Sequence, residues 1–181
     1  MALSNFAAYI ERNERFAATD ARNHVPHPVV PNKQLYLITC IDSRVEPAAI
    51  VGSEFGEAIV ARNVGGRVTP AVIKDLAWVL VLHENLVPDA DWFEIAVIHH
   101  TDCGSGFFAN DEMRADYVAR GGWDDKTALG MAVLEPAKTV AEDVQKLRTA
   151  PELQPATGNL RIGGYTYDLK TGKITTVVEP S

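Results

Sequence analysis

The 181-residue sequence alternates short apolar runs with longer stretches whose apolar residues recur every three or four residues. Residues 35–39, 58–61 and 93–98 are rich in strand-forming side chains, and their unbroken apolar character predicts strands covered on both faces. Between them, residues 46–51 and 71–86 have the composition or spacing of helices. Strands that alternate with helices form parallel sheets with right-handed crossovers, so this order predicts an α/β fold.

The last quarter of the chain predicts a helix followed by a hairpin. Residues 136–150 carry an apolar stripe at helical spacing. Strand-like runs at 160–162, 165–169 and 174–178 surround a polar turn at 170–173, as expected for antiparallel pairing. The whole pattern predicts a mainly parallel sheet of about four strands, with flanking helices and a C-terminal antiparallel edge strand.

Residues 104–134 give a weaker signal because glycines interrupt the periodicity. Only residues 110–120 have the character of a helix. The segment also contains four aromatic residues, which we expect to line or cap the entrance of a pocket: Phe107, Phe108, Tyr117 and Trp123. Its role is otherwise left open by the sequence.

The N-terminal part is predicted to be a separate arm. Residues 4–18 indicate a helix with Ser4 or Asn5 as its cap, and residues 24–32 contain three prolines that exclude helix and stiffen the connection. We therefore divide the chain into an arm and connector, 1–32, and a single α/β domain, 33–181, which contains the candidate zinc-binding and catalytic residues described below. Because the apolar residues of the arm have no core of their own, we expect the arm to clasp a second copy of the chain.

Composition narrows the classes of partner. The chain is 46% hydrophobic and 23% charged, which is typical of a globular protein, and its formal charge of -7 with a pI near 5.2 shows no basic footprint for nucleic acid or an anionic membrane. No apolar run approaches the ~18 residues of a membrane span, and the N-terminal residues do not resemble a signal peptide. We expect a cytoplasmic protein with a small-molecule substrate.

Thiol and imidazole groups follow two of the predicted strands. Cys40 comes directly after the first strand, and His99, His100 and Cys103 follow the third. The carboxyl ends of parallel strands are where such folds bind ligands, and a Cys-His-Cys set suits zinc. Strand alternation and the three-residue spacing to Cys103 favour His100 as the ligand and leave His99 structural. Spacing alone also permits the alternative that these are small buried cysteines beside a histidine that satisfies a carbonyl.

Two charged residues next to Cys40 change this balance. Asp42 and Arg44 stand two and four residues after the thiol, in a tight turn after the strand, where they can form a bidentate ion pair. Taken singly, they are better explained as a solvated ion pair or a cap for the helix near Glu46. Beside Cys40, His100 and Cys103 they favour a catalytic site.

Three sequence blocks, in this order and spacing, resemble the signature of the β-class carbonic anhydrases. The blocks are Cys40-Ile-Asp42-Ser43-Arg44, Ala61-Arg62-Asn63-Val64-Gly65-Gly66 and His100-Thr101-Asp102-Cys103-Gly104. The resemblance extends over about residues 33–181 and is to the compact branch of the family, which also includes carbonyl sulfide hydrolases. It implies one Zn²⁺ per chain on Cys40, His100 and Cys103, an orienting Asp42–Arg44 dyad, and a homodimer or homotetramer.

The resemblance also implies a mechanism, in which zinc-bound hydroxide attacks CO2 to give bicarbonate in a reversible hydration. Two thiolates cancel the charge of zinc, so a nearby acceptor such as Asp42 would help to generate the hydroxide. Without the hold of Arg44, Asp42 could become a fourth metal ligand in a closed state. Asn63 and the backbone N–H groups near Gly65 and Gly104 are expected to bind substrate, although the Asn63–Gly66 segment is equally consistent with an ordinary turn.

Two other functions remain open at this point. A carbonyl sulfide hydrolase would use the same zinc site to convert carbonyl sulfide and water to CO2 and hydrogen sulfide, and the motifs do not separate it from a carbonic anhydrase. A catalytically silent zinc-binding interaction module is the other alternative, although a structural zinc has no use for a carboxylate held off the metal. The pocket glutamine of larger family members has no counterpart, since Gln34 precedes the first strand. The remaining histidines, His24, His27 and His83, are expected to be core or surface residues.

Overall fold

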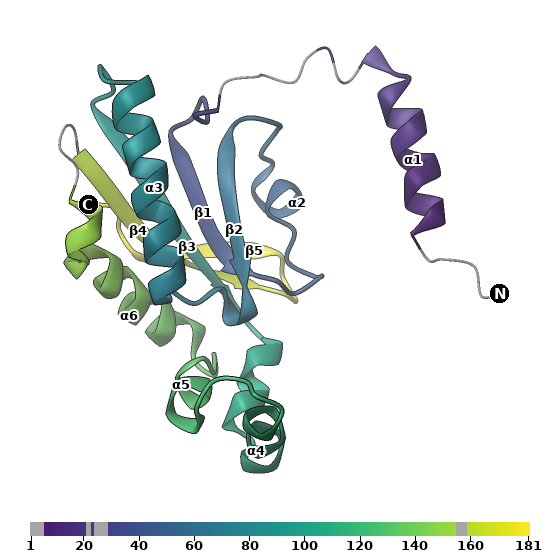
Figure 1. Cartoon of the computed structure of the whole chain (residues 1–181), viewed down its shortest axis with the longest axis vertical. Helices are drawn as coiled ribbons and strands as arrows, with labels where there is room; N and C mark the ends of the chain where they lie inside the picture. The colour runs from purple at the N-terminus through teal and green to yellow at the C-terminus, as the bar shows by residue number, and fades with distance from the viewer. Residues whose placement is uncertain (1–5, 21–22, 24–28, 155–158) are drawn as a thin grey trace.

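A five-stranded sheet forms the centre of the molecule (Figure 1). The computed structural model describes residues 6–20, 23, 29–154 and 159–181. The strands lie in the order β2-β1-β3-β4-β5, and their bounds are β1 Leu35–Cys40, β2 Ala58–Asn63, β3 Trp92–His100, β4 Asn159–Asp168 and β5 Lys173–Val178. The first four are parallel and β5 pairs antiparallel with β4. The predicted fold class is therefore confirmed.

Six α-helices lie among the described residues: α1 Ala7–Ala17, α2 Pro47–Val51, α3 Pro70–Leu86, α4 Asp111–Ala119, α5 Asp125–Gly130 and α6 Pro136–Thr149. Helices α3 and α6 cover the same face of the sheet, while α4 and α5 lie beyond the end of it (Figure 1). Helix α3 begins where the sequence predicts, because the Thr69 side chain accepts a hydrogen bond from the Val72 N–H and Pro70 occupies the first turn. Within the described ranges, no helix has the length and apolar character to cross a membrane.

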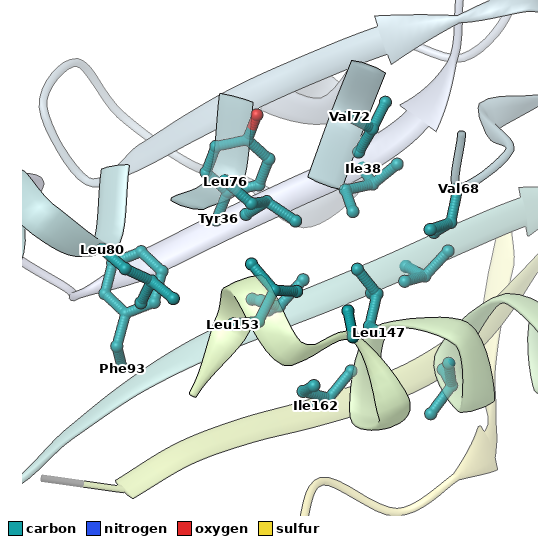
Figure 2. Close-up of a cluster of buried hydrophobic side chains, with 14 of the residues drawn as sticks. Tyr36, Ile38, Val68, Val72, Leu76, Leu80, Phe93, Leu147, Leu153 and Ile162 are labelled. Atoms are coloured by element: carbon teal, nitrogen blue, oxygen red, sulfur yellow. The ribbon is translucent and has the colours of Figure 1, made fainter. Parts of the chain in front are cut away.

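The main core lies between this face and the two helices (Figure 2). Strand residues Ile38 and Ile95 meet Leu76 of α3 and Leu147 of α6, and all four side chains are fully buried. Burial of each such side chain stabilises the fold by about 1.5–3 kcal/mol relative to its exposure. Helix α6 and strand β3 are thereby fixed together, which positions the carboxyl end of β3.

Burial on both faces is confirmed for two of the three predicted strands. Nearly every residue of β1 and β3 is buried. Strand β2 is only half-buried, and Val60 is 41% exposed. The difference arises because β2 lies at the edge of the sheet. Its apolar sequence predicted burial on both faces, but the rest of the chain covers this strand only in part.

The C-terminal hairpin is confirmed with one change, since the two runs at 160–162 and 165–169 form a single strand, β4. The strand continues through Gly163 and Gly164. A Cβ at Gly164 would lie 2.9 Å from Val144 Cγ2 of α6, which explains why a glycine occupies that position. In the 104–134 segment, the predicted helix appears as α4, capped by Asn110. Helix α5 was not predicted because it is a short turn begun by an Asp124 cap.

Helix α1 has no buried residue, and every residue of it except the half-buried Phe16 is exposed. A ring contact joins it to the body, between Phe16 and Phe55, whose centroids are 6.1 Å apart. Just before β1, the Asn32 N–H donates to the Gly56 carbonyl and attaches the chain to the sheet. The predicted caps Ser4 and Asn5, and the histidines His24 and His27, lie outside the described residues.

Candidate metal centre

Three buried ligand-bearing side chains converge at the carboxyl edge of the sheet. Cys40 ends β1, His100 ends the neighbouring strand β3, and Cys103 follows in the next turn. Their ligand atoms all lie within 4.8 Å of one another, and the two sulfur atoms are 3.8 Å apart. The parallel register of β1 and β3 brings together residues that are 60 positions apart in sequence. This set of donors can hold a metal ion.

The hydrogen bonds of His100 define which of its nitrogens faces the cysteines. Its Nδ1 lies 2.9 Å from the Thr101 carbonyl oxygen, which can only accept, so Nδ1 carries the proton. Nε2 is therefore a lone-pair nitrogen, and among the described residues it is buried without a hydrogen-bond partner. A buried unpaired acceptor is costly, and coordination of a metal would satisfy it. His100 is thus in the tautomer of a metal ligand.

The two thiols share one proton in the absence of a metal ion. The hydrogen bond between them lowers the pKa of Cys103 to about 6, with a further contribution from Ser105, and raises the pKa of Cys40 to about 12. One sulfur is therefore a thiolate at neutral pH, which is the form that binds metals.

Asp42 and Arg44 form the predicted bidentate pair. Nε and Nη2 of Arg44 donate to the two carboxylate oxygens of Asp42, at 3.0 and 2.7 Å. These hydrogen bonds hold the pKa of Asp42 well below its usual range. Asp42 Oδ2 lies 4.0 Å from His100 Nε2. The carboxylate is thus ionised and stands beside the three candidate ligands.

Two residues that support this pair were not singled out from the sequence. Asp102 accepts a hydrogen bond of 2.8 Å from Arg44 Nη1, and its φ of 52° places it in the left-handed region. Arg62 donates to the carbonyl oxygens of Cys40, Asp42 and Val45 at 2.6–3.0 Å and so braces the loop after β1. Both lie inside the three signature blocks, but only their contacts across the sheet edge show their roles.

The glycine block packs against the backbone of Cys40, the first of the candidate ligands. Gly66 has a φ of +65°, and a Cβ there would lie 2.8 Å from the Cys40 nitrogen. Gly65 has a φ of +77°, and a Cβ there would lie 2.9 Å from Ser105 Oγ. Asn63 donates through Nδ2 to the Arg67 carbonyl. These residues form the wall beside Cys40, and the binding of substrate by Asn63 and Gly65 stays a prediction.

His99 has the structural environment that was expected of it. Its Nδ1 lies 2.8 Å from Thr139 Oγ1 and its Nε2 lies 3.2 Å from the Gly66 carbonyl. Nearby, the fully buried carboxylate of Asp143 accepts hydrogen bonds from Arg67 Nε and Nη2, at 2.7 and 3.1 Å. Burial alone would raise the pKa of Asp143, but the hydrogen bonds from His99 and Arg67 outweigh it and leave the pKa well below its usual range. This network ties α6 to the glycine block.

A cavity of about 490 Å³ opens beside the cluster. Its lining includes Arg44, Cys103, Gly104, Phe107 and Leu134, and the binding of substrate by Gly104 stays a prediction. Phe107 and Leu134 are largely exposed and form an apolar rim. The other aromatic residues of this segment do not contribute to that lining, because they pack against one another with ring centroids 5.2–6.1 Å apart: Phe108, Tyr117 and Trp123.

Comparisons with known proteins identify relatives of this chain. The carbonic anhydrase family model matches residues 35–120. β-Carbonic anhydrase 1 of Mycobacterium tuberculosis is 31% identical over 154 residues, covering 84% of this chain and 86% of the relative. The crystal structure of carbonic anhydrase from Streptococcus mutans has a TM-score of 0.76 at 30% identity, covering 98% of this chain and 99% of that one. A carbon disulfide hydrolase of Acidianus sp. is 25% identical over 166 residues, 79% of this chain and 76% of the relative.

These matches and the Cys-His-Cys cluster define the class as that of the carbonic-anhydrase-like α/β proteins. Within it, the chain belongs to the β-carbonic anhydrase family.

Proposed function

We propose that the protein is a zinc-dependent carbonic anhydrase that catalyses the reversible hydration of CO2 to bicarbonate. The observation that carries this proposal is the position of Asp42. Its carboxylate stands beside the ligands, but Arg44 holds both of its oxygens and leaves the ligand set at three. Three protein ligands with an open fourth position are typical of catalytic zinc, whereas structural zinc has four.

The donor set fits one zinc ion per chain. Cys40 and Cys103 supply thiolate sulfur and His100 supplies a neutral imidazole nitrogen, the ligands that zinc prefers. When bound, zinc would act as a Lewis acid and lower the pKa of a coordinated water molecule enough to provide a nucleophile near neutral pH.

The chain's own residues orient the reaction. Asp42 Oδ2 is ionised and can accept a hydrogen bond from a water molecule beside the three ligands, while Arg44 fixes the direction of that acceptor. Release of Asp42 by Arg44 would free the carboxylate to act as a fourth ligand and close the site. Gly104 lines the cavity, and its backbone N–H is a candidate donor to an oxyanion. Asn63 and Gly65 are the further candidates for substrate binding.

The second candidate function is hydrolysis of carbonyl sulfide by the same residues. Two observations favour it: a relative is a carbon disulfide hydrolase, and the rim of the cavity is apolar at Phe107 and Leu134. An apolar rim favours a substrate with a soft, weakly hydrated sulfur atom. Carbon dioxide is retained as the proposed substrate because the M. tuberculosis and S. mutans relatives, which are 31% and 30% identical and cover 84% and 98% of this chain, are carbonic anhydrases.

We also infer that the chain assembles into a homodimer or homotetramer through the arm. Helix α1 buries none of its residues, and Tyr9, Ile10 and the N-cap residue Phe6 are exposed. An exposed apolar helix face of this kind is typical of an interaction surface. A chain that lacks residues 1–23 should sediment as a smaller species than the full chain, and unchanged sedimentation would contradict this assignment.

The test of the proposed function combines elemental analysis with two assays on one preparation, purified under reducing conditions without chelator. About one zinc per chain, with fast CO2 hydration in stopped flow and little sulfide from carbonyl sulfide, would support a carbonic anhydrase. The reverse preference would reassign the substrate and keep the site. Protein without metal would refute the proposal. Retained zinc with neither activity would indicate the silent binding module.

A further inference from the structure

We propose that Ser105 is a positioning residue of the metal centre, whose hydroxyl donates a hydrogen bond to the Cys103 sulfur and so orients that ligand and limits its electron donation. The inference rests on the proposed function, since it requires that Cys103 bind a metal. Ser105 stands two residues after Cys103, in the short 3-10 segment Gly104–Ala109.

The side chain of Ser105 is buried and in contact with the ligand. Its Oγ lies 3.2 Å from Cys103 Sγ, and the residue is only 5% exposed. The same Oγ accepts a hydrogen bond of 3.2 Å from the Val133 N–H. Ser105 therefore connects the ligand turn to the segment that precedes α6 and lines the cavity.

The direction of the hydrogen bond follows from the chemistry of the two groups. A serine hydroxyl has one proton, and the Val133 N–H already donates to its oxygen. A cysteine that binds zinc does so as a thiolate and has no proton to donate. The Ser105 proton must then point to Cys103 Sγ, which is the acceptor within its reach among the described residues.

The surroundings hold the hydroxyl in this place. Gly65 approaches so closely that a Cβ there would lie 2.9 Å from Ser105 Oγ and 3.1 Å from the Met131 carbonyl oxygen. The glycine at position 65 thus makes room for the serine. A group that donates to a ligand atom tunes both its orientation and its basicity, and loss of such a partner typically changes metal affinity or activity about 10–100-fold.

The experiment uses the full-length chain loaded with Co²⁺, whose thiolate-to-metal charge-transfer band reports the electron density on sulfur. Ser105→Ala should move this band to longer wavelength, because a thiolate that loses a hydrogen bond gives up its electrons more easily. In a competition with a chromophoric chelator, the zinc affinity of Ser105→Ala should fall about 10-fold. Ser105→Thr, which retains a hydroxyl, should restore both values. Ser105→Gly provides the same test if Ser105→Ala does not fold.

Thr69→Val is the matched control. The Thr69 hydroxyl accepts a backbone N–H at 3.3 Å, as Ser105 does, but it caps α3 and is not a neighbour of the ligands. Its loss should lower the thermal midpoint and leave both metal readouts unchanged. A Ser105→Ala protein whose band and affinity match those of Thr69→Val would overturn the inference. A wild-type chain that binds neither metal would refute the proposed function itself, and that result is seen without any variant.

Discussion

Arg44 holds both carboxylate oxygens of Asp42, with Nε–Oδ1 and Nη2–Oδ2 distances of 3.0 and 2.7 Å. The pairing fixes the carboxylate in one plane beside the ligands and keeps it ionised. A lysine could neutralise the charge but could not reproduce this fork. The geometry of the pair, as well as its charge, is therefore expected to matter for turnover.

Arg44→Lys should lower kcat for CO2 hydration about 100-fold, the scale of a lost acid–base contribution, with zinc content unchanged. The physical reason is that Asp42, once released from the bidentate pair, loses its direction and can occupy the fourth metal position. Stopped-flow rates and elemental analysis on the same sample would measure both quantities. Arg120→Lys, which alters an exposed pair with Asp116, is the control and should leave the rate unchanged. A wild-type rate in Arg44→Lys would show that the fork is dispensable.

Asp102→Gly should reduce kcat by a smaller factor, about threefold, because the Arg44–Asp102 pair is exposed to solvent and such pairs are weak. Glycine is chosen because Asp102 has a φ of 52°, so the substitution removes the carboxylate and retains the backbone conformation. Asp102→Asn keeps an acceptor oxygen, so its kcat should lie between those of the wild type and Asp102→Gly. Equal rates in all three proteins, measured by stopped flow, would remove Asp102 from the positioning of Arg44.

Asp143→Asn should destabilise the fold by about 3–5 kcal/mol at neutral pH, because it removes the buried carboxylate that pairs with the buried Arg67 and leaves that guanidinium with the half-exposed Glu142 at 3.7 Å. The pKa of Asp143 is depressed in the folded state, so its contribution is fully present above the unfolded value, near pH 4. That contribution is lost as the pH falls below this value toward the depressed pKa of the folded state. In urea denaturation, the difference in the free energy of unfolding between the variant and the wild type should be smaller at about pH 3 than at pH 7.

The control for this prediction is a substitution at an exposed aspartate. Asp116→Asn removes an exposed aspartate and should change the free energy of unfolding by no more than about 0.5 kcal/mol. A gap between Asp143→Asn and the wild type that stays constant from pH 7 to pH 3 would contradict the assigned ionisation of Asp143.

The parallel sheet and the ligand set were predictable because their signals are local. Cys40 and His100 each end an apolar run, and in a parallel sheet such ends meet at one edge. Ser105 and Asp102 were missed because each acts through a contact made after folding, with Val133 and with Arg44. The spacing of apolar residues does not predict the contacts of a single hydroxyl or of an exposed carboxylate.

Gly66→Ala should both destabilise the fold and weaken zinc binding, because two costs coincide at this residue. Alanine at a φ of +65° is strained by about 1–2 kcal/mol, and its Cβ would press within 2.8 Å of the Cys40 nitrogen and displace the first ligand. Gly52→Ala separates the costs, since Gly52 has a φ of +68° but no neighbour within 4 Å of an added Cβ. In urea denaturation, the free energy of unfolding of Gly52→Ala should fall by the conformational cost alone, and its zinc affinity should be unchanged. Equal zinc affinities in the two variants would show that the Gly66–Cys40 approach does not position the ligand.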